Sequence, residues 1–170
     1  NRAELFGAGP DPLYVSKIES QGTSFGAESE TRKHVFDRVT NGGEWSQLLV
    51  PEEGADPIYV YRLQFIGHPG FGGVAIDAEK DVLPDGLEFV GFVDEADKAS
   101  GAGAVPGPVN TAEGNLVASF DRNAGPQGTI TLAQRPGTVF PDGSTANVYF
   151  AARIVDVHKA IVNDFGNAST

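Results

Sequence analysis

The sequence predicts an all-β fold, and three features of its composition and patterning lead to that prediction. Glycine supplies 22 and proline 11 of the 170 residues, so the chain is divided into many short segments. Several of these segments are rich in aromatic and β-branched residues at strand length, and none forms an amphipathic helix of any length. Hydrophobic residues make up 40% of the chain, which is enough for a proper core.

The individual strands are predicted from short apolar runs that end at Gly, Pro, Asn or Asp, and the run 58–66 is the clearest of them. Residues 1–12 form an irregular lead-in, 94–114 form a long surface loop, and 28–39 fit either a helix or a strand. Eight or nine strands at this spacing indicate an immunoglobulin-like β-sandwich in one domain, 1–170. The predicted strands are 13–19, 58–66, 73–81, 87–93, 115–120, 129–133, 146–157 and 161–169.

The charge and the residue types that are missing exclude several classes of function. The formal net charge of −11 argues against binding to nucleic acid or to anionic membranes, because both require a basic surface. No apolar stretch has the length of a membrane span, so we expect no membrane insertion. Cysteine is absent, which excludes disulfides and thiolate metal sites. Methionine is absent even at position 1, and we expect the chain to be processed or excised from a larger multidomain protein.

Motifs for enzyme chemistry are weak. The run from Gly22 to Gly26 matches the G-x-S-x-G nucleophile pattern, but that pattern needs a strand before it and a helix after it in an α/β sheet. The three histidines have no metal-ligand spacing, and the acids around Asp77 and Asp81 do not fit a calcium loop. We therefore predict neither a metal, nor a cofactor, nor an enzyme that turns over substrate.

A lysine and an asparagine occupy unusual positions at the two ends of the predicted sandwich. Lys17 shares the apolar face of the first predicted strand with Leu13 and Val15. Asn163 and Asn167 share one face of the last predicted strand. The plain interpretation of Lys17 is an edge position from which the ammonium reaches solvent.

Four segments together resemble the isopeptide-forming domains of Gram-positive surface adhesins and pilins. They span most of the chain, and the clearest is Asp81-Val82-Leu83-Pro84-Asp85-Gly86-Leu87, which is similar to the family's Asp-x-Leu-Pro-x-Gly-Leu signature. The other three are Val15-Ser16-Lys17, then Asn41-Gly42-Gly43-Glu44-Trp45 followed by Tyr59-Val60-Tyr61-Arg62-Leu63, and Phe165-Gly166-Asn167-Ala168-Ser169.

The resemblance implies a covalent bond between a lysine and an asparagine, formed once per molecule. It assigns Lys17 as the nucleophile, Asn167 as the electrophile and Asp81 as the general acid and base. Apolar burial favours a neutral lysine amine and a protonated acid, and that acid polarises the carboxamide while ammonia leaves. Three alternatives stay open, because Asn163 shares the face of Asn167, a bulge would turn Asp77 inward, and Asp156 lies on the neighbouring long strand.

The resemblance also implies a function and a location. We expect a monomeric stalk or adhesin module in the cell wall of a Gram-positive bacterium, with neighbouring domains of the same protein as partners. The alternative is an adhesin head that binds a sugar or a host protein through loops 94–114 or 20–56 and has no internal crosslink.

Overall fold

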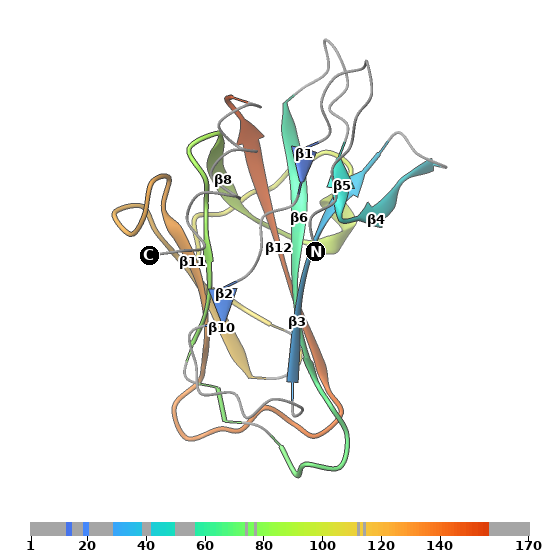
Figure 1. Ribbon diagram of the computed structural model, residues 1–170, viewed down its shortest axis with the longest axis vertical. Helices are drawn as coiled ribbons and strands as arrows, with labels where there is room; N and C mark the ends of the chain where they lie inside the picture. The colour runs from blue at the N-terminus through green and yellow to red at the C-terminus, as the bar shows by residue number, and fades with distance from the viewer. Residues whose placement is uncertain are drawn as a thin grey trace.

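The chain folds as an all-β sandwich, which confirms the predicted fold class. In the computed structural model, two five-stranded antiparallel sheets face each other, and a two-stranded sheet pairs β1 (Leu13–Tyr14) with β5 (Leu48–Leu49). Figure 1 shows β10 and β11 on one side of the molecule and β3, β6 and β12 on the other. The structure describes residues 13–14, 19–20, 29–38, 42–49, 57–73, 75–76, 78–111, 113 and 115–156.

The larger sheet, here called the β6 sheet, has β6 near its centre. Its strand order is β4 (Glu44–Ser46), β3 (Ser29–Asp37), β6 (Ile58–Gly67), β12 (Thr145–Ile154) and β8 (Leu87–Val93). The alternation of residue types along β6 buries Tyr61, Leu63 and Phe65 in the core, as a period of two requires. β12 pairs with β6 from Thr145 to Arg153, so these two long strands form the central part of the sheet.

The second sheet, here called the β11 sheet, covers the inner face of the first. Its strand order is β2 (Glu19–Ser20), β7 (Glu79–Val82), β11 (Thr129–Gln134), β10 (Leu116–Asp121) and β9 (Val109–Asn110). A hairpin whose loop spans residues 122–128 joins β10 to β11, in register from Leu116 opposite Gln134 to Asp121 opposite Thr129. β7 brings two acidic residues into this sheet beside β11.

The hydrophobic core lies between the two sheets and is rich in aromatic rings. Tyr61 and Phe150 stack with ring centroids 5.2 Å apart, and Phe89 stacks on Phe120 at 4.0 Å. The buried set also includes Val35, Leu63, Phe65, Leu83, Phe92, Leu116, Ala118, Ile130, Leu132, Phe140 and Val148. The core therefore contains side chains from strands of both large sheets.

The segment after β8 folds back across the outer face of the β6 sheet. It includes the 3-10 turn η2 (Glu95–Asp97), and the Lys98 ammonium lies 5.5 Å from the ring centroid of Phe36 on β3. A Cβ added to Gly101 would lie 3.2 Å from Cβ of Ala151, so this segment packs closely on β12. The segment 94–114 is therefore only partly a surface loop, because it also contains β9.

Several details of the predicted strands need correction. Among the described residues, the two large sheets contain ten strands, whereas the sequence predicts eight or nine. The segment 28–39, which fitted a helix or a strand, forms β3, and the predicted strand 73–81 is reduced to β7 at 79–82. The lead-in 1–12 and the predicted last strand 161–169 lie outside the described residues.

Candidate functional site

A buried ion pair between Lys33 and Asp81 joins the two sheets through the core. Nζ of Lys33 donates a hydrogen bond of 2.8 Å to Oδ1 of Asp81 and also lies 2.8 Å from Oδ2. The side chains of the two residues are 2% and 1% exposed. Because charged side chains are almost never fully buried unless paired, this pair is the most unusual polar feature of the core.

The alternation of each strand brings the two residues together. Lys33 on β3 lies opposite Leu63 on β6, and Leu63 lies opposite Val148 on β12. Residues that are directly opposite share a face of the sheet, so Lys33 points toward the core with these two aliphatic residues. Asp81 on β7 lies opposite the buried Ile130 on β11 and points into the core from the second sheet.

Two aromatic rings border the ammonium group. Nζ of Lys33 lies 5.4 Å from the ring centroid of Tyr61 and 5.7 Å from that of Phe150. The faces of aromatic rings attract a cation, and together the stacked rings keep water from the amine. The pair therefore sits in an apolar compartment.

The surroundings of Asp81 raise the pKa of its carboxyl group. Burial raises the pKa of Asp81 above its ordinary value, while the charge of the Lys33 ammonium and its hydrogen bond oppose that rise. Oδ2 is buried and accepts no hydrogen bond, although the ammonium is close to it. This oxygen therefore has the capacity to contact one more donor group, such as a carboxamide.

Glu79 is a second buried acid beside the pair. It is 5% exposed and lies two residues before Asp81 on β7, so both side chains are on the same face of the strand. The strand β7 thus brings two carboxyl groups into the core, and Lys33 contacts the second of them.

Of the site residues predicted from the sequence, the structure places Asp81 in this compartment. Lys17, Asp77, Asn163 and Asn167 lie outside the described residues, so their predicted roles stay predictions. Asp156 is half-buried just after β12, where its backbone N–H donates to the carbonyl oxygen of Gly86.

Lys33 is the residue that sequence reasoning missed. It follows the polar run Ser29–Arg32 and precedes His34, which conceals the strand alternation. The one available signal is Val35, two residues later, because a strand would place Lys33 on the same face as this buried valine.

Metal clusters and membrane-spanning helices are not found in the described part of the chain. Its residues include no group of three His, Asp or Glu side chains that could hold a metal ion. None of its helices has the length and hydropathy of a membrane span. Comparisons of the chain with protein-family models, with curated proteins and with solved structures found no match.

Proposed function

We propose that this chain is a structural module of a bacterial cell-surface protein, stabilised by a spontaneous isopeptide bond between Lys33 and an asparagine near the C-terminus. The observation that carries the proposal is the buried contact between Lys33 and Asp81 under two aromatic rings. The resemblance of the segment 81–87 to the isopeptide-forming domains supports it, because Asp81 begins that segment.

Lys33 replaces Lys17 as the proposed nucleophile because Lys33 contacts the acid. A general acid or base must lie within hydrogen-bond distance of the proton that it transfers, and the distance of 2.8 Å between Nζ and Asp81 meets this requirement. The electrophile remains as predicted from the sequence, Asn167 or, as the alternative, Asn163.

The reaction needs only these three side chains. A proton passes from Nζ of Lys33 to the Asp81 carboxylate, and the neutral amine attacks Cγ of the asparagine. The raised pKa of Asp81 favours the protonated acid, which hydrogen-bonds the carboxamide oxygen as negative charge develops on it. The bond between Cγ and Nδ2 then breaks as Asp81 gives its proton to the leaving nitrogen and takes the second proton that Nζ loses. The products are one amide, one ammonia and a protonated Asp81.

The energetic cost of burying the charges of Lys33 and Asp81 also supports the proposed crosslink. Removing a lysine and an aspartate from water costs several kcal/mol per ion, and the attraction between them often does no more than offset this cost. A crosslink removes both charges from the core, because the lysine becomes an amide and the acid stays neutral. It would also close a loop of roughly 130 residues, which stabilises the fold by about 5 kcal/mol in the chain-entropy model.

Peptide mapping tests the assignment of the bonded residues. After proteolysis of the folded protein, tandem mass spectrometry should identify one branched peptide that joins the segment around Lys33 to the segment around Asn167. A branch at Asn163 would correct the electrophile only, and a branch at Lys17 would show that Lys33 is not the nucleophile. If both lysines are found only in linear peptides, the proposal is wrong and the alternative adhesin head without a crosslink is favoured.

A further inference from the structure

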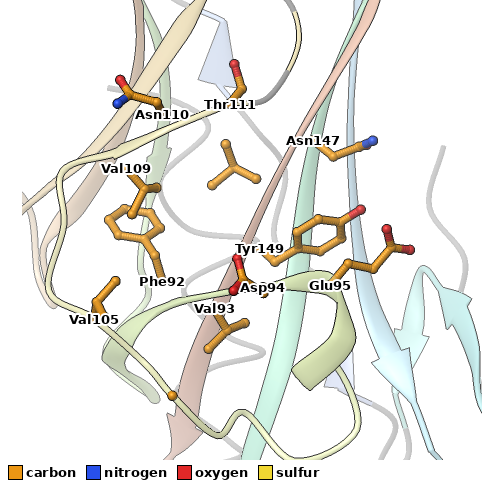
Figure 2. A pocket seen from close by; sticks show the side chains of 12 residues that line it. Phe92, Val93, Asp94, Glu95, Val105, Val109, Asn110, Thr111, Asn147 and Tyr149 are labelled. Atoms are coloured by element: carbon orange, nitrogen blue, oxygen red, sulfur yellow. The ribbon is translucent and has the colours of Figure 1, made fainter.

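A pocket of about 270 Å³ lies on the side of the sandwich opposite β3, between the two sheets. Figure 2 shows Asn147, Tyr149 and Glu95 on one of its sides, Val105, Val109 and Phe92 on the other, and Asp94 between the two sides. The pocket is independent of the Lys33 site, and none of its lining residues contacts Lys33 or Asp81 in the contacts described above.

The pocket lies where one edge of β12 has no neighbour among the described strands. β12 pairs with β6 from Thr145 onward, but it pairs with β8 only from Tyr149 onward. β8 ends at Val93, and the chain then leaves the sheet for η2. Among the described strands, none therefore lies beside Thr145–Val148 on the β8 side.

The hydrogen bonds of β12 show which backbone groups face this open edge. Gly67 donates to the carbonyl oxygen of Ser144, and Ile154 donates to that of Pro57, so the even-numbered residues of β12 bond to β6. The backbone N–H and C=O groups of the odd-numbered residues point the other way. Tyr149 meets Val93 of β8, whereas Asn147 lines the pocket, and the groups of Thr145 lie further along the same edge of β12.

The side chains that line the pocket would also suit an extended peptide with apolar and basic residues. Its inner wall is apolar, with Phe92, Val109 and Val148. Asp94 and Glu95 are the charged residues that line it, both are exposed, and the whole chain has a net charge of −11. The Asp94 carboxylate makes no capping hydrogen bond to η2, so it is available to a cation.

We propose that this open edge binds an extended peptide as an additional strand beside Thr145–Val148. Main-chain hydrogen bonds to Thr145 and Asn147 hold the peptide, as in other cases of strand addition to a sheet edge. Its alternate apolar residues face Phe92, Val109 and Val148, and its Lys or Arg residues face Asp94 and Glu95. The partner is therefore a protein segment of strand-forming, basic sequence.

The test uses the full chain and the peptide acetyl-Lys-Val-Thr-Val-Lys-amide, with two-dimensional ¹H–¹⁵N NMR as the readout. We expect saturable shifts in the amide signals of Thr145 and Asn147, with a dissociation constant of roughly 0.1–1 mM for so short a segment. A peptide methylated at the threonine nitrogen should bind at least about fivefold more weakly, because it lacks one main-chain donor. A peptide with Glu in place of both Lys residues should also bind more weakly.

Two variants of the protein locate the site. Asp94→Lys should weaken binding of the basic peptide, whereas Asp85→Lys, the same charge change at an exposed residue before β8, should not. Asn147→Pro removes an N–H that β6 does not use, and it should also weaken binding. If this variant does not fold, the N-methylated peptide still tests the main-chain pairing, because it removes a donor of the peptide instead of a donor of the protein.

Three results would each overturn the proposal: no saturable shifts, equal affinity for the N-methylated peptide, or equal effects of the Asp94 and Asp85 changes. Shifts that also appear in the peptide-free protein as its concentration rises would identify a second copy of this chain as the occupant, and they would overturn the proposed basic partner.

Discussion

Two adjacent residues of β3 form ion pairs of similar length in opposite surroundings. Arg32 contacts Glu30 at 2.6 Å on the outer face of the β6 sheet, where the side chains are 47% and 40% exposed. Lys33, the next residue, contacts Asp81 at 2.8 Å in the core. The strand alternation alone separates these pairs, because it turns Arg32 toward solvent and Lys33 toward the second sheet.

The comparison shows that the distance between the charges does not determine how an ion pair affects stability or chemistry. Water screens the charges of Arg32 and Glu30 and solvates them equally well when they separate, so this pair contributes little to stability. The compartment around Lys33 is buried, so a proton transfer there would change the energy of the core, and in the proposed reaction it would prepare the amine for attack. The two pairs differ mainly in their exposure to solvent. The next experiments therefore make matched changes in the buried pair and in the exposed pair and compare the results.

Replacing the two cations should give the largest difference. Lys33→Ala would prevent the proposed crosslink and leave the Asp81 carboxyl buried without its partner, at a cost of about 3–5 kcal/mol from the unpaired acid alone. We expect the melting temperature to fall by roughly 10 °C or more. Arg32→Ala should change it by no more than about 1 °C, and equal effects of the two variants would contradict the comparison.

Replacing the two acids tests the catalyst. Asp81→Asn keeps the shape of the side chain but cannot transfer the proton, so the variant should fold, keep its full mass and melt at a lower temperature. Glu30→Gln should leave both the mass and the melting temperature of the wild type unchanged. If Asp81→Asn still loses ammonia while Asp77→Asn or Asp156→Asn does not, Asp81 is the wrong acid.

The pH dependence of stability should also differ. The pKa of Asp81 is raised in the folded protein, so the folded state binds the proton more tightly than the unfolded state. In the variant Lys33→Met, which retains the buried acid without its cation, the unfolding free energy should therefore fall as the pH rises above about 4. Urea unfolding at several pH values measures this, and a stability that rises over the same range would have the wrong sign.

The pKa of Glu30 is lowered by its hydrogen bond to Arg32, and this predicts the opposite sign for the exposed pair. Any stabilisation of the fold by Glu30 should be lost as the pH falls below the ordinary pKa of a glutamate. A salt concentration of about 1 M should also remove this stabilisation. This is the smallest expected effect, and the comparison of wild type with Glu30→Gln at low and high salt measures it. An effect that persists in high salt would show that this pair is not simply exposed.

The sequence predicts the sandwich well because the signals for its long strands are local. The run Ile58–Ile66 alternates aromatic and aliphatic residues with Arg62 and Gln64, and this pattern determines both the strand and its inner face. The sequence also singles out Asp81 as a candidate site residue, because it begins a segment that resembles a known signature, and its role as the acid stays a prediction.

Lys33 could not be predicted with the same certainty, because its position depends on long-range pairing. The run Ser29–His34 is polar throughout, and β3 is a strand because it pairs with β6 on one side and β4 on the other. The open edge of β12 was missed for the same reason, since it depends on where β8 leaves the sheet. Such features come from the register of strands distant in sequence, which tertiary context decides.

The intact mass of the folded protein tests the central claim most directly. The account predicts that the wild type and Lys17→Ala each weigh about 17 Da less than their sequences, the mass of one ammonia, and that Lys33→Ala has its full sequence mass. A full sequence mass for the folded wild type would contradict the account. Loss of ammonia in Lys33→Ala together with full mass in Lys17→Ala would contradict the assignment of Lys33 and restore Lys17 as the nucleophile.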